Sequence, residues 1–435
     1  MTRTIVMMCG LLAFGLVVAL SLPTGPSNTT RPEPARPEPV LTAENAAELC
    51  RSLFEEPKEY IDGDAKRRRW DLRAESCKKA YDADPANPEL KAAVARNLPY
   101  AQKAEAIAML REAASQGSAE AHYQIYEHHR SWDRGDLDKA QLVTRAEAAE
   151  ALRKAAELGH LAAARTLVGR LEYGSIVKRD VIAARSWAER VVANPAKDAN
   201  QGGDLLSLGS LLDTSDSADE RARGLDILER LNAPGHYLYG AQRELALAIR
   251  KQDPVRARAL LEEARRPDPG GALVPLAEML IAGEGGPADP KRALSMLTGK
   301  SDSWLPMAEG ASKSWMAKGM LGRLTLEGKL VPRDIQEAVK LLDNGSSYDF
   351  EARMLVLRML AEYPETRVSR PKMTLYDAVQ DAELDEPGAM KALIDLKLSA
   401  NAQFQDRPGA CKLIETAVSR GDQGMAERLA QCRTN

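Results

Sequence analysis

The chain has 435 residues, with 60 basic and 63 acidic side chains, and its formal net charge is −3. This near-neutral balance excludes the strong basic excess that nucleic-acid-binding proteins usually show. Apolar residues make up 44% of the chain, so a large core can be buried and disorder throughout is excluded. Aromatic residues make up only 5%, which leaves little material for a catalytic cleft or a stacking surface.

The first element is an uncharged apolar run over residues 5–22. Ala19 and Ser21 have the spacing that a signal peptidase requires, which predicts a cleaved export signal. The run is also long enough to span a bilayer, so a retained anchor that tethers the chain to the inner membrane is the alternative interpretation. Residues 23–40 are rich in Pro and predict an extended linker. Both interpretations place the remainder of the chain in the periplasm.

Four cysteines follow the apolar run, in two pairs that are local in the sequence: Cys50 with Cys77, and Cys411 with Cys432. Separations of 27 and 21 residues suit one helix, a short turn and an antiparallel return helix, so facing positions can meet the geometry of a disulfide. The other pairings would join opposite ends of the chain, which an elongated fold would forbid. An exported chain favours two disulfides over the alternative of four buried free thiols.

Other local patterns give weak signals for chemistry. The basic run over residues 66–70 indicates a solvent-exposed helix face, with a docking patch for an acidic partner or a lipid headgroup as the alternative. Ser76 and Lys79 match the S-x-x-K of penicillin-recognising enzymes, but neither S-D-N nor K-T-G follows. The histidines at 122, 128 and 129 are expected at solvated or capping positions, because a closed metal site needs three or four converging ligands. No catalytic residue, metal or cofactor is therefore expected.

The interior of the chain repeats a spacing of Asp, three residues, then Ala, followed by a Leu-rich stretch. The intervals between these Asp residues are close to one or two units of about 36 residues, the scale of helical-hairpin repeats. Each Asp is predicted to cap a helix by accepting its free N–H groups. The five positions are Asp180, Asp253, Asp289, Asp334 and Asp406.

Glycines mark the ends of the preceding helices. Three of them lie six residues before a repeat Asp, and two close an Ala-Ala-x-x-Gly pattern. Gly readily takes the left-handed conformation that ends a helix. Between these boundaries Ala164, Leu167, Val168 and Leu171 have the spacing of a one-sided helix. The predicted turn glycines are Gly174, Gly283 and Gly328, together with Gly117 and Gly159.

The segment from Leu158-Gly159-His160 through Tyr173-Gly174 to Asp180, Ala184 and Trp187 resembles the Sel-one-like repeat (SLR). This family is related to the tetratricopeptide repeat (TPR), and the segments 276–297 and 321–342 are similar to it. The resemblance implies an all-α fold, a right-handed α-solenoid of antiparallel helix pairs with a concave face that binds protein partners. It also implies that His160 and Trp187 are structural.

The expected function of this protein is that of an exported, non-catalytic protein–protein interaction scaffold in the bacterial envelope. It would assist or regulate polysaccharide or secretion machinery. The alternative is a cell-wall-related hydrolase of a β-lactamase-like, cysteine-rich repeat type. The identity of the partner does not follow from the sequence. The expected parts are a signal or anchor (1–22), a linker (23–40), TPR-like hairpins (41–100), an SLR solenoid (101–345) and divergent helical repeats (346–435).

Overall fold

The computed structural model separates Met1–Thr42 from Ala43–Asn435. The expected signal or anchor and the expected linker lie outside the residues it describes. None of the helices in the described ranges has the length and apolar content needed to cross a membrane. The described residues are 41–42, 45–52, 63–130, 142–174, 176–194, 200–233, 238, 240–264, 269–299, 314–345, 350–386 and 388–433.

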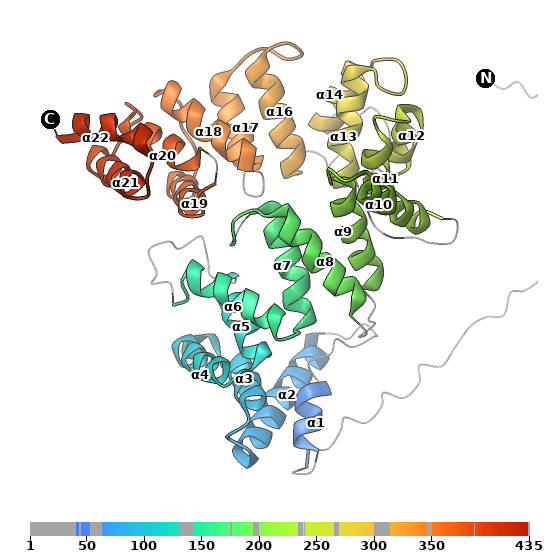
Figure 1. Cartoon of the computed structure of the whole chain (residues 1–435), viewed down its shortest axis with the longest axis vertical. Helices are drawn as coiled ribbons and strands as arrows, with labels where there is room; N and C mark the ends of the chain where they lie inside the picture. The colour runs from blue at the N-terminus through green and yellow to red at the C-terminus, as the bar shows by residue number, and fades with distance from the viewer. Residues whose placement is uncertain are drawn as a thin grey trace, which may run out of the picture. The chain divides into compact units, whose positions relative to one another are not determined.

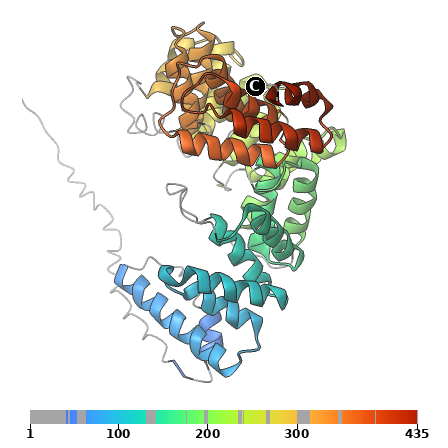
Figure 2. The same cartoon turned by 90° about the vertical axis from the view of Figure 1, so that its left-hand side faces the viewer.

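The described residues contain helices and turns but no strand, which confirms the predicted all-α fold. The first part of the chain includes the 21-residue helix α2, drawn in blue in Figure 2. A short 3-10 helix, Tyr100–Gln102, precedes α4. The helices of this part are α1 (Ala46–Ser52), α2 (Gly63–Ala83), α3 (Pro88–Asn97), α4 (Lys103–Ser115) and α5 (Ala119–Arg130).

Successive helices of the middle part pack as antiparallel pairs, of which α7 with α8 and α13 with α14 are examples (Figure 1). These helices are α6 (Arg145–Glu157), α7 (Leu161–Tyr173), α8 (Val181–Ala193), α9 (Gln201–Asp213), α10 (Ala218–Leu231), α11 (Ala241–Ile249), α12 (Pro254–Ala264), α13 (Pro269–Ala282) and α14 (Pro290–Thr298).

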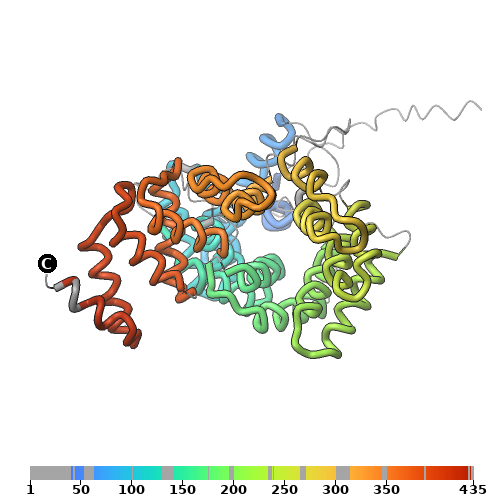
Figure 3. Tube along the Cα trace, turned by 90° about the horizontal axis from the view of Figure 1, so that it is seen from above, coloured from blue at the N-terminus to red at the C-terminus, as the bar shows by residue number. Residues whose placement is uncertain are grey.

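The last part continues with the pair α16 and α17 and ends in short helices. The tube in Figure 3 shows how each helix turns back into the next one. A 3-10 helix, Gln423–Met425, precedes the last α-helix. The helices are α16 (Trp315–Glu327), α17 (Ile335–Gly345), α18 (Phe350–Glu362), α19 (Pro371–Glu383), α20 (Ala389–Leu398), α21 (Arg407–Ser419) and α22 (Ala426–Arg433).

Aspartates begin the helices at the repeat boundaries. Each of the five repeat Asp carboxylates accepts a hydrogen bond from the backbone N–H three residues later, at 2.9–3.0 Å. An N-cap of this kind stabilises a helix by about 1 kcal/mol, because it satisfies a donor that has no partner inside the helix. These caps lie before α8 (Asp180), α12 (Asp253), α14 (Asp289), α17 (Asp334) and α21 (Asp406).

Glycines in the left-handed conformation end several helices. Gly174 and Gly328 cap the C-termini of α7 and α16, with φ of 67° and 71°. Gly117 and Gly159 have φ of 91° and 90° in the turns that follow α4 and α6. Gly283 has φ of 73° after α13. The boundaries are therefore local properties of the sequence, because Gly alone adopts this conformation without a Cβ penalty.

The core is distributed along the chain. Ala164, Leu167, Val168 and Leu171 on α7 are all buried, which confirms the one-sided helix that their spacing predicts. A fully buried Leu side chain contributes about 1.5–3 kcal/mol relative to an exposed one. Each cluster of buried side chains draws on one stretch of chain, as repeat architectures require. The main clusters span residues 92–227, 228–324 and 339–404.

Ion pairs join equivalent helices of neighbouring pairs. In one layer, formed by α5, α7, α9, α11 and α13, Arg165 on α7 binds Asp204 on α9 at 2.7 Å. In the other layer, formed by α4, α6, α8, α10, α12 and α14, Arg185 on α8 binds Glu220 on α10 at 2.8 Å. An ion pair at the surface contributes at most about 1 kcal/mol to stability, so apolar packing holds the helices together. The ion pairs fix the register of one helix against the next. Further pairs in the second layer are Arg111–Glu147, Arg223–Glu189, Arg256–Glu229 and Arg292–Glu262.

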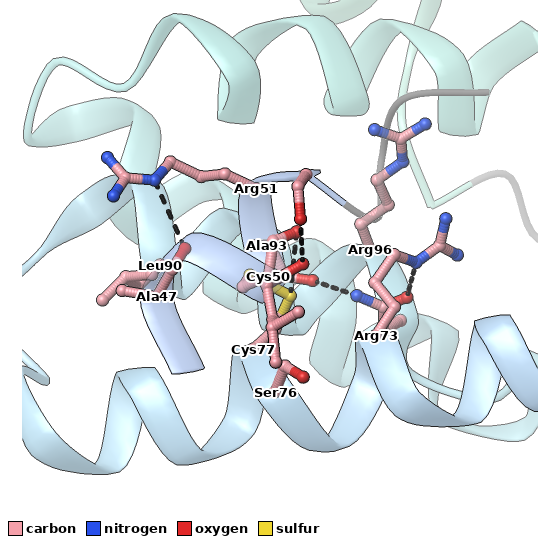
Figure 4. Close-up of a disulfide and its surroundings, with 12 residues drawn as sticks. Ala47, Cys50, Arg51, Arg73, Ser76, Cys77, Leu90, Ala93 and Arg96 are labelled. Atoms are coloured by element: carbon pink, nitrogen blue, oxygen red, sulfur yellow. Dashed lines mark hydrogen bonds between the residues drawn. A yellow bond between two sulfur atoms is a disulfide. The ribbon is translucent and has the colours of Figure 1, made fainter. Parts of the chain in front are cut away.

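Two disulfides close the two ends of the described chain, and their pairing confirms the prediction. Cys50 on α1 is bonded to Cys77 on α2, with their Cα atoms 4.7 Å apart (Figure 4). Cys411 on α21 is bonded to Cys432 on α22, with a Cα separation of 5.7 Å. Both bonds join adjacent helices, so they stabilise the terminal pairs locally.

Candidate functional site

The S-x-x-K match on α2 does not form an accessible nucleophile. Ser76 is fully buried, and its hydroxyl donates a hydrogen bond to the Leu72 carbonyl one turn earlier, at 2.7 Å. Lys79 is exposed, whereas Ser76 lies among the residues that α2 packs into the core. A catalytic serine needs a base within hydrogen-bond reach and an open approach for its substrate, and Ser76 has no open approach.

The histidines have structural surroundings. The described residues contain no group of three His, Cys, Asp or Glu side chains that could hold a metal ion. The expectation of solvated or capping positions is wrong for His129, which is buried with its Nδ1 atom 3.1 Å from the Val143 carbonyl oxygen. Burial lowers the pKa of His122 and of His128, with Lys154 and Lys103 adding to the effect. His160 caps α7, since its Nδ1 atom accepts from the Ala163 N–H at 3.1 Å.

The tryptophans divide into packed and partly exposed positions. Trp187 is half-buried and packs against the core, and the Arg190 guanidinium lies 4.7 Å from its ring centre. Trp315 is half-buried at the start of α16. Trp70 is 42% exposed on α2. Trp132 and Trp304 lie outside the described residues.

A small depression between α18 and α19 has room for about one water molecule. It is lined by residues of these two helices, among them Arg353, Leu357 and Asp377. A cavity that holds a substrate or cofactor is usually some tens of times larger. This depression is therefore too small for a substrate, whereas an open surface can bind a protein partner.

Three successive helices of the first layer present such a surface, which we call the α7–α11 surface: Glu172 and Tyr173 on α7, Asp213 on α9, and Arg243 and Glu244 on α11. Tyr173 is the last residue of α7 and is 67% exposed, which is unusual for a large side chain in this chain. The neighbouring Leu247, one turn after Arg243, is 41% exposed. Exposed aromatic and aliphatic side chains among polar groups are typical of protein-binding surfaces.

Carboxylates crowd around Tyr173. Burial raises the pKa of Glu172, and the negative charge of Glu244 raises it further, against the opposing effects of Tyr173 and Arg179. Burial also raises the pKa of Asp213, and Glu244 contributes in the same direction, against the opposing charge of Arg221. Glu244 itself binds Arg243 at 2.7 Å and accepts a hydrogen bond from Ser210 at 2.9 Å. A positively charged group from a partner would therefore be favoured here.

The C-terminal helices reach the same region. Glu386, in the turn before α20, is buried and accepts a hydrogen bond at 3.2 Å from the backbone N–H of Arg179, in the turn after α7. Arg145, the first residue of α6, donates to the carbonyl oxygen of Gln380 and, at 3.0 Å, to its side-chain oxygen. These contacts join residues more than 200 positions apart. The turn beside Tyr173 therefore contacts Glu386, a residue far outside the neighbouring helix pairs.

No sequence motif marks the residues of the α7–α11 surface as functional. Tyr173 lies inside the segment that resembles the SLR family, where it is interpreted as part of a repeat. One signal for it was present, because an aromatic residue directly before a helix-ending Gly cannot be buried by its own helix pair as easily as one in mid-helix. The grouping of Glu172, Asp213 and Glu244 has no sequence signal.

The helix pairs, their Gly ends and their Asp caps make the chain an all-α protein built from successive antiparallel helix pairs. No protein-family profile matches the chain, and no curated protein matches it. Among solved structures it is similar to c5321, a protective antigen of uropathogenic Escherichia coli with an SLR fold, at 16% identity and a TM-score of 0.39, covering 90% of this chain and 79% of that one.

Two further structures are similar at the same level. A Sel1 repeat protein from Oxalobacter formigenes has 19% identity and a TM-score of 0.36, covering 74% of this chain and 89% of that one. Yeast Tom70 has 12% identity and a TM-score of 0.37, covering 90% and 87%. All three TM-scores are below 0.5, so the fold is established by the chain's own helix pairs and not by these neighbours.

Proposed function

We propose that this protein is a non-catalytic interaction scaffold whose α7–α11 surface binds a segment of a protein partner. The observation that carries the proposal is the 67% exposure of Tyr173 beside Glu172 and Glu244. Tyr is enriched among the residues that contribute most to binding at protein interfaces. The surrounding carboxylates favour a partner segment that carries Lys or Arg.

Helical repeat architecture supports a binding role of this kind. Successive pairs present equivalent helices side by side, so one extended segment can contact α7, α9 and α11 in turn. The described residues show no metal site, and the depression between α18 and α19 is too small for a substrate. Binding across an open surface accounts for the exposed Tyr173, because burying its ring against a partner would remove apolar area from water.

Affinity capture from envelope extracts tests this function. The wild-type chain and a Tyr173→Ala variant are used as bait, with Val255→Ala as the matched control because Val255 is 66% exposed on α12, in the other layer. The partner recovered with wild type should be lost with Tyr173→Ala and retained with Val255→Ala. Recovery of the same partner at the same yield by the Tyr173→Ala variant would contradict the proposal.

We further infer that the protein works in the bacterial envelope, where it assists or regulates polysaccharide or secretion machinery. Two disulfides support export, because such bonds persist in oxidising compartments. The apolar run over residues 5–22 supports it independently. Alkylation of the protein in intact cells with and without reductant tests the location. The four cysteines of the two disulfides should react only after reduction, and reaction of any of these four without reductant would contradict export.

A further inference from the structure

Two polar contacts join the region of α6 and α7 to the region of α19 and α20. Arg145, the first residue of α6, donates to the backbone and side-chain oxygens of Gln380 on α19, 235 positions later. Glu386, in the turn before α20, accepts the backbone N–H of Arg179, 207 positions earlier, at 3.2 Å. In a repeat architecture each unit packs mainly on its neighbours, so stacking alone does not explain contacts over such distances along the chain.

Both contacts lie at matching ends of their helices. α6 begins at Arg145, and Arg179 lies in the turn between α7 and α8, so both residues are at the same end of these three antiparallel helices. Gln380 lies in the last turn of α19, and Glu386 follows in the turn between α19 and α20. The two contacts are therefore neighbours, placed so that they can form and break together.

Among the described residues, no cluster of buried apolar side chains includes members of both regions. The cluster around α6 and α7 draws on residues 92–227, and the cluster around α19 and α20 draws on residues 339–404. Burial of apolar area holds the adjacent helices within each region together, whereas these two contacts are hydrogen bonds. Opening the two contacts would therefore leave both apolar cores intact.

Burial of two charged groups limits how favourable the closed contacts are. Arg145 and Glu386 are each only 8% exposed. Removing a charge from water costs free energy, which hydrogen bonds within the protein offset. Burial accordingly lowers the pKa of Arg145, against the opposing charges of Asp381 and Glu383, and Asp381 is itself paired with Arg353 at 2.7 Å. When the contacts open, water solvates both side chains again, so the net cost of opening is small.

Arg179 connects these contacts to the α7–α11 surface. Its backbone N–H is held by Glu386, and its Nε atom donates to the Glu172 carbonyl oxygen at 3.1 Å. Burial raises the pKa of Glu172, and the positive charge of Arg179 opposes this effect. Gly174 faces Glu386 so closely that a Cβ there would lie 2.9 Å from a carboxylate oxygen. The turn that Glu386 holds therefore begins directly after Tyr173.

We propose that the contacts of Arg145 and Glu386 form one reversible latch, which opens while the apolar cores on both sides stay intact. When it is closed, the latch fixes the turn after Tyr173, and in this way it regulates the α7–α11 surface. The latch itself is defined by contacts within the chain and does not depend on the proposed function. Its regulatory effect rests on the proposed function, because that effect requires a partner at the α7–α11 surface.

Amide hydrogen exchange of the full chain tests whether the two contacts open together. The Arg179 amide donates to Glu386, so its exchange reports the open latch directly. Arg145→Ala breaks the other contact and should accelerate exchange in residues 176–180 on the order of tenfold, the effect of losing one typical hydrogen bond. Exchange of the α7 amides should stay unchanged, because the core around α7 remains closed.

Control variants separate the latch from local damage. Glu386→Ala removes the acceptor and should accelerate exchange in residues 176–180, whereas Glu386→Gln keeps an acceptor oxygen and should exchange more slowly than the Ala variant. Arg223→Ala removes an exposed ion pair with Glu189 between α8 and α10 and should exchange like wild type. Unchanged exchange in residues 176–180 of Arg145→Ala would overturn the latch, because the two contacts would then open separately. Faster exchange throughout α7 would overturn it too, since the core would then open as well.

Affinity capture from envelope extracts tests the regulatory effect separately. With Arg145→Ala as bait, recovery of the partner should fall below that of wild type, because the turn after the intact Tyr173 is no longer fixed. Arg223→Ala should recover the partner as well as wild type does. Full recovery by Arg145→Ala, together with loss by Tyr173→Ala, would overturn the regulatory effect and leave the proposed function standing. Full recovery by Tyr173→Ala would overturn the proposed function and the regulatory effect together, while the exchange experiment decides on the latch itself.

Discussion

His160 connects two neighbouring helices of the first layer through both of its ring nitrogens. Its Nδ1 atom accepts the Ala163 N–H at the start of α7, and its Nε2 atom lies 2.9 Å from a carboxylate oxygen of Glu120 on α5. Because Nδ1 accepts a hydrogen bond, Nε2 is the nitrogen that carries the proton and donates to Glu120. One side chain therefore caps a helix and fixes its position against the preceding pair.

Replacing His160 with Ala should lower the free energy of unfolding by about 2 kcal/mol, because the cap and the hydrogen bond to a charged group are lost together. His160→Asn is the matched control, since Asn is a good N-cap residue but is shorter and should keep only the cap. Urea denaturation measures both. The explanation fails if His160→Ala is as stable as wild type, or if the Asn variant is the less stable of the two.

Glu120 should make stability fall at acid pH. Burial on its own would raise the pKa of Glu120, but the hydrogen bond from His160, the charge of Arg96 and the hydrogen bond from Gln124 outweigh it and lower the pKa. The unfolded chain then takes up the proton first as the pH falls, so this contribution is present above the usual carboxyl pKa and is lost as the pH falls through the folded value. Between about pH 5 and pH 3, wild type should lose more stability than Glu120→Gln. Parallel curves for the two proteins would show that Glu120 has no such role.

Each disulfide should stabilise only its own end of the chain. Closing a loop of 21 residues between Cys411 and Cys432 is worth about 3 kcal/mol on the chain-entropy model. Hydrogen exchange of Cys411→Ser/Cys432→Ser should therefore accelerate in α21 and α22 and stay unchanged in α2. Cys50→Ser/Cys77→Ser should give the reverse pattern. Faster exchange at both ends from either double variant would contradict this local behaviour.

Substitution by Ala should have opposite effects on stability at two glycines of α7: Gly174, which caps its C-terminus, and Gly169, which lies in its middle. Gly174 has φ of 67°, and a Cβ there would lie 2.9 Å from a Glu386 carboxylate oxygen and 3.0 Å from the Arg179 Cβ. Gly174→Ala should cost about 1–2 kcal/mol or more. A Cβ at Gly169 meets nothing within 4 Å, so Gly169→Ala should stabilise by up to about 1 kcal/mol through helix propensity. Thermal unfolding measures both effects as shifts in Tm. Similar shifts in the two variants would contradict the different backbone conformations assigned to Gly174 and Gly169.

Arg145 should hold α19 against α6. Burial lowers the pKa of Arg145, against the opposing effect of the negative charges of Asp381 and Glu383. Removing the guanidinium from water costs free energy, which the hydrogen bonds to Gln380 must offset. Arg145→Ala should speed amide exchange in α19. Arg111→Ala removes a half-exposed pair with Glu147 between adjacent helices and should leave α19 unchanged. Unchanged exchange in α19 of the Arg145 variant would exclude a holding role.

The sequence by itself determined the local structure. The repeat aspartates and the glycines before them define helix ends through backbone geometry within a few residues, so they can be recognised without any tertiary information. Cys50 with Cys77 and Cys411 with Cys432 were predictable for the same reason, since each pair joins adjacent helices. The buried face of α7 follows from the helical spacing of Ala164, Leu167, Val168 and Leu171.

The tertiary structure alone decided which distant residues meet. Arg145 with Gln380, and Arg179 with Glu386, are brought together by small rotations that accumulate over many successive pairs, and no local pattern records their sum. The grouping of Glu172 and Glu244 beside Tyr173, with Asp213 near Glu244, depends in the same way on how three helix pairs stack. The burial of His129 was missed because a helix periodicity shows which residues share a face, but not which loop covers it.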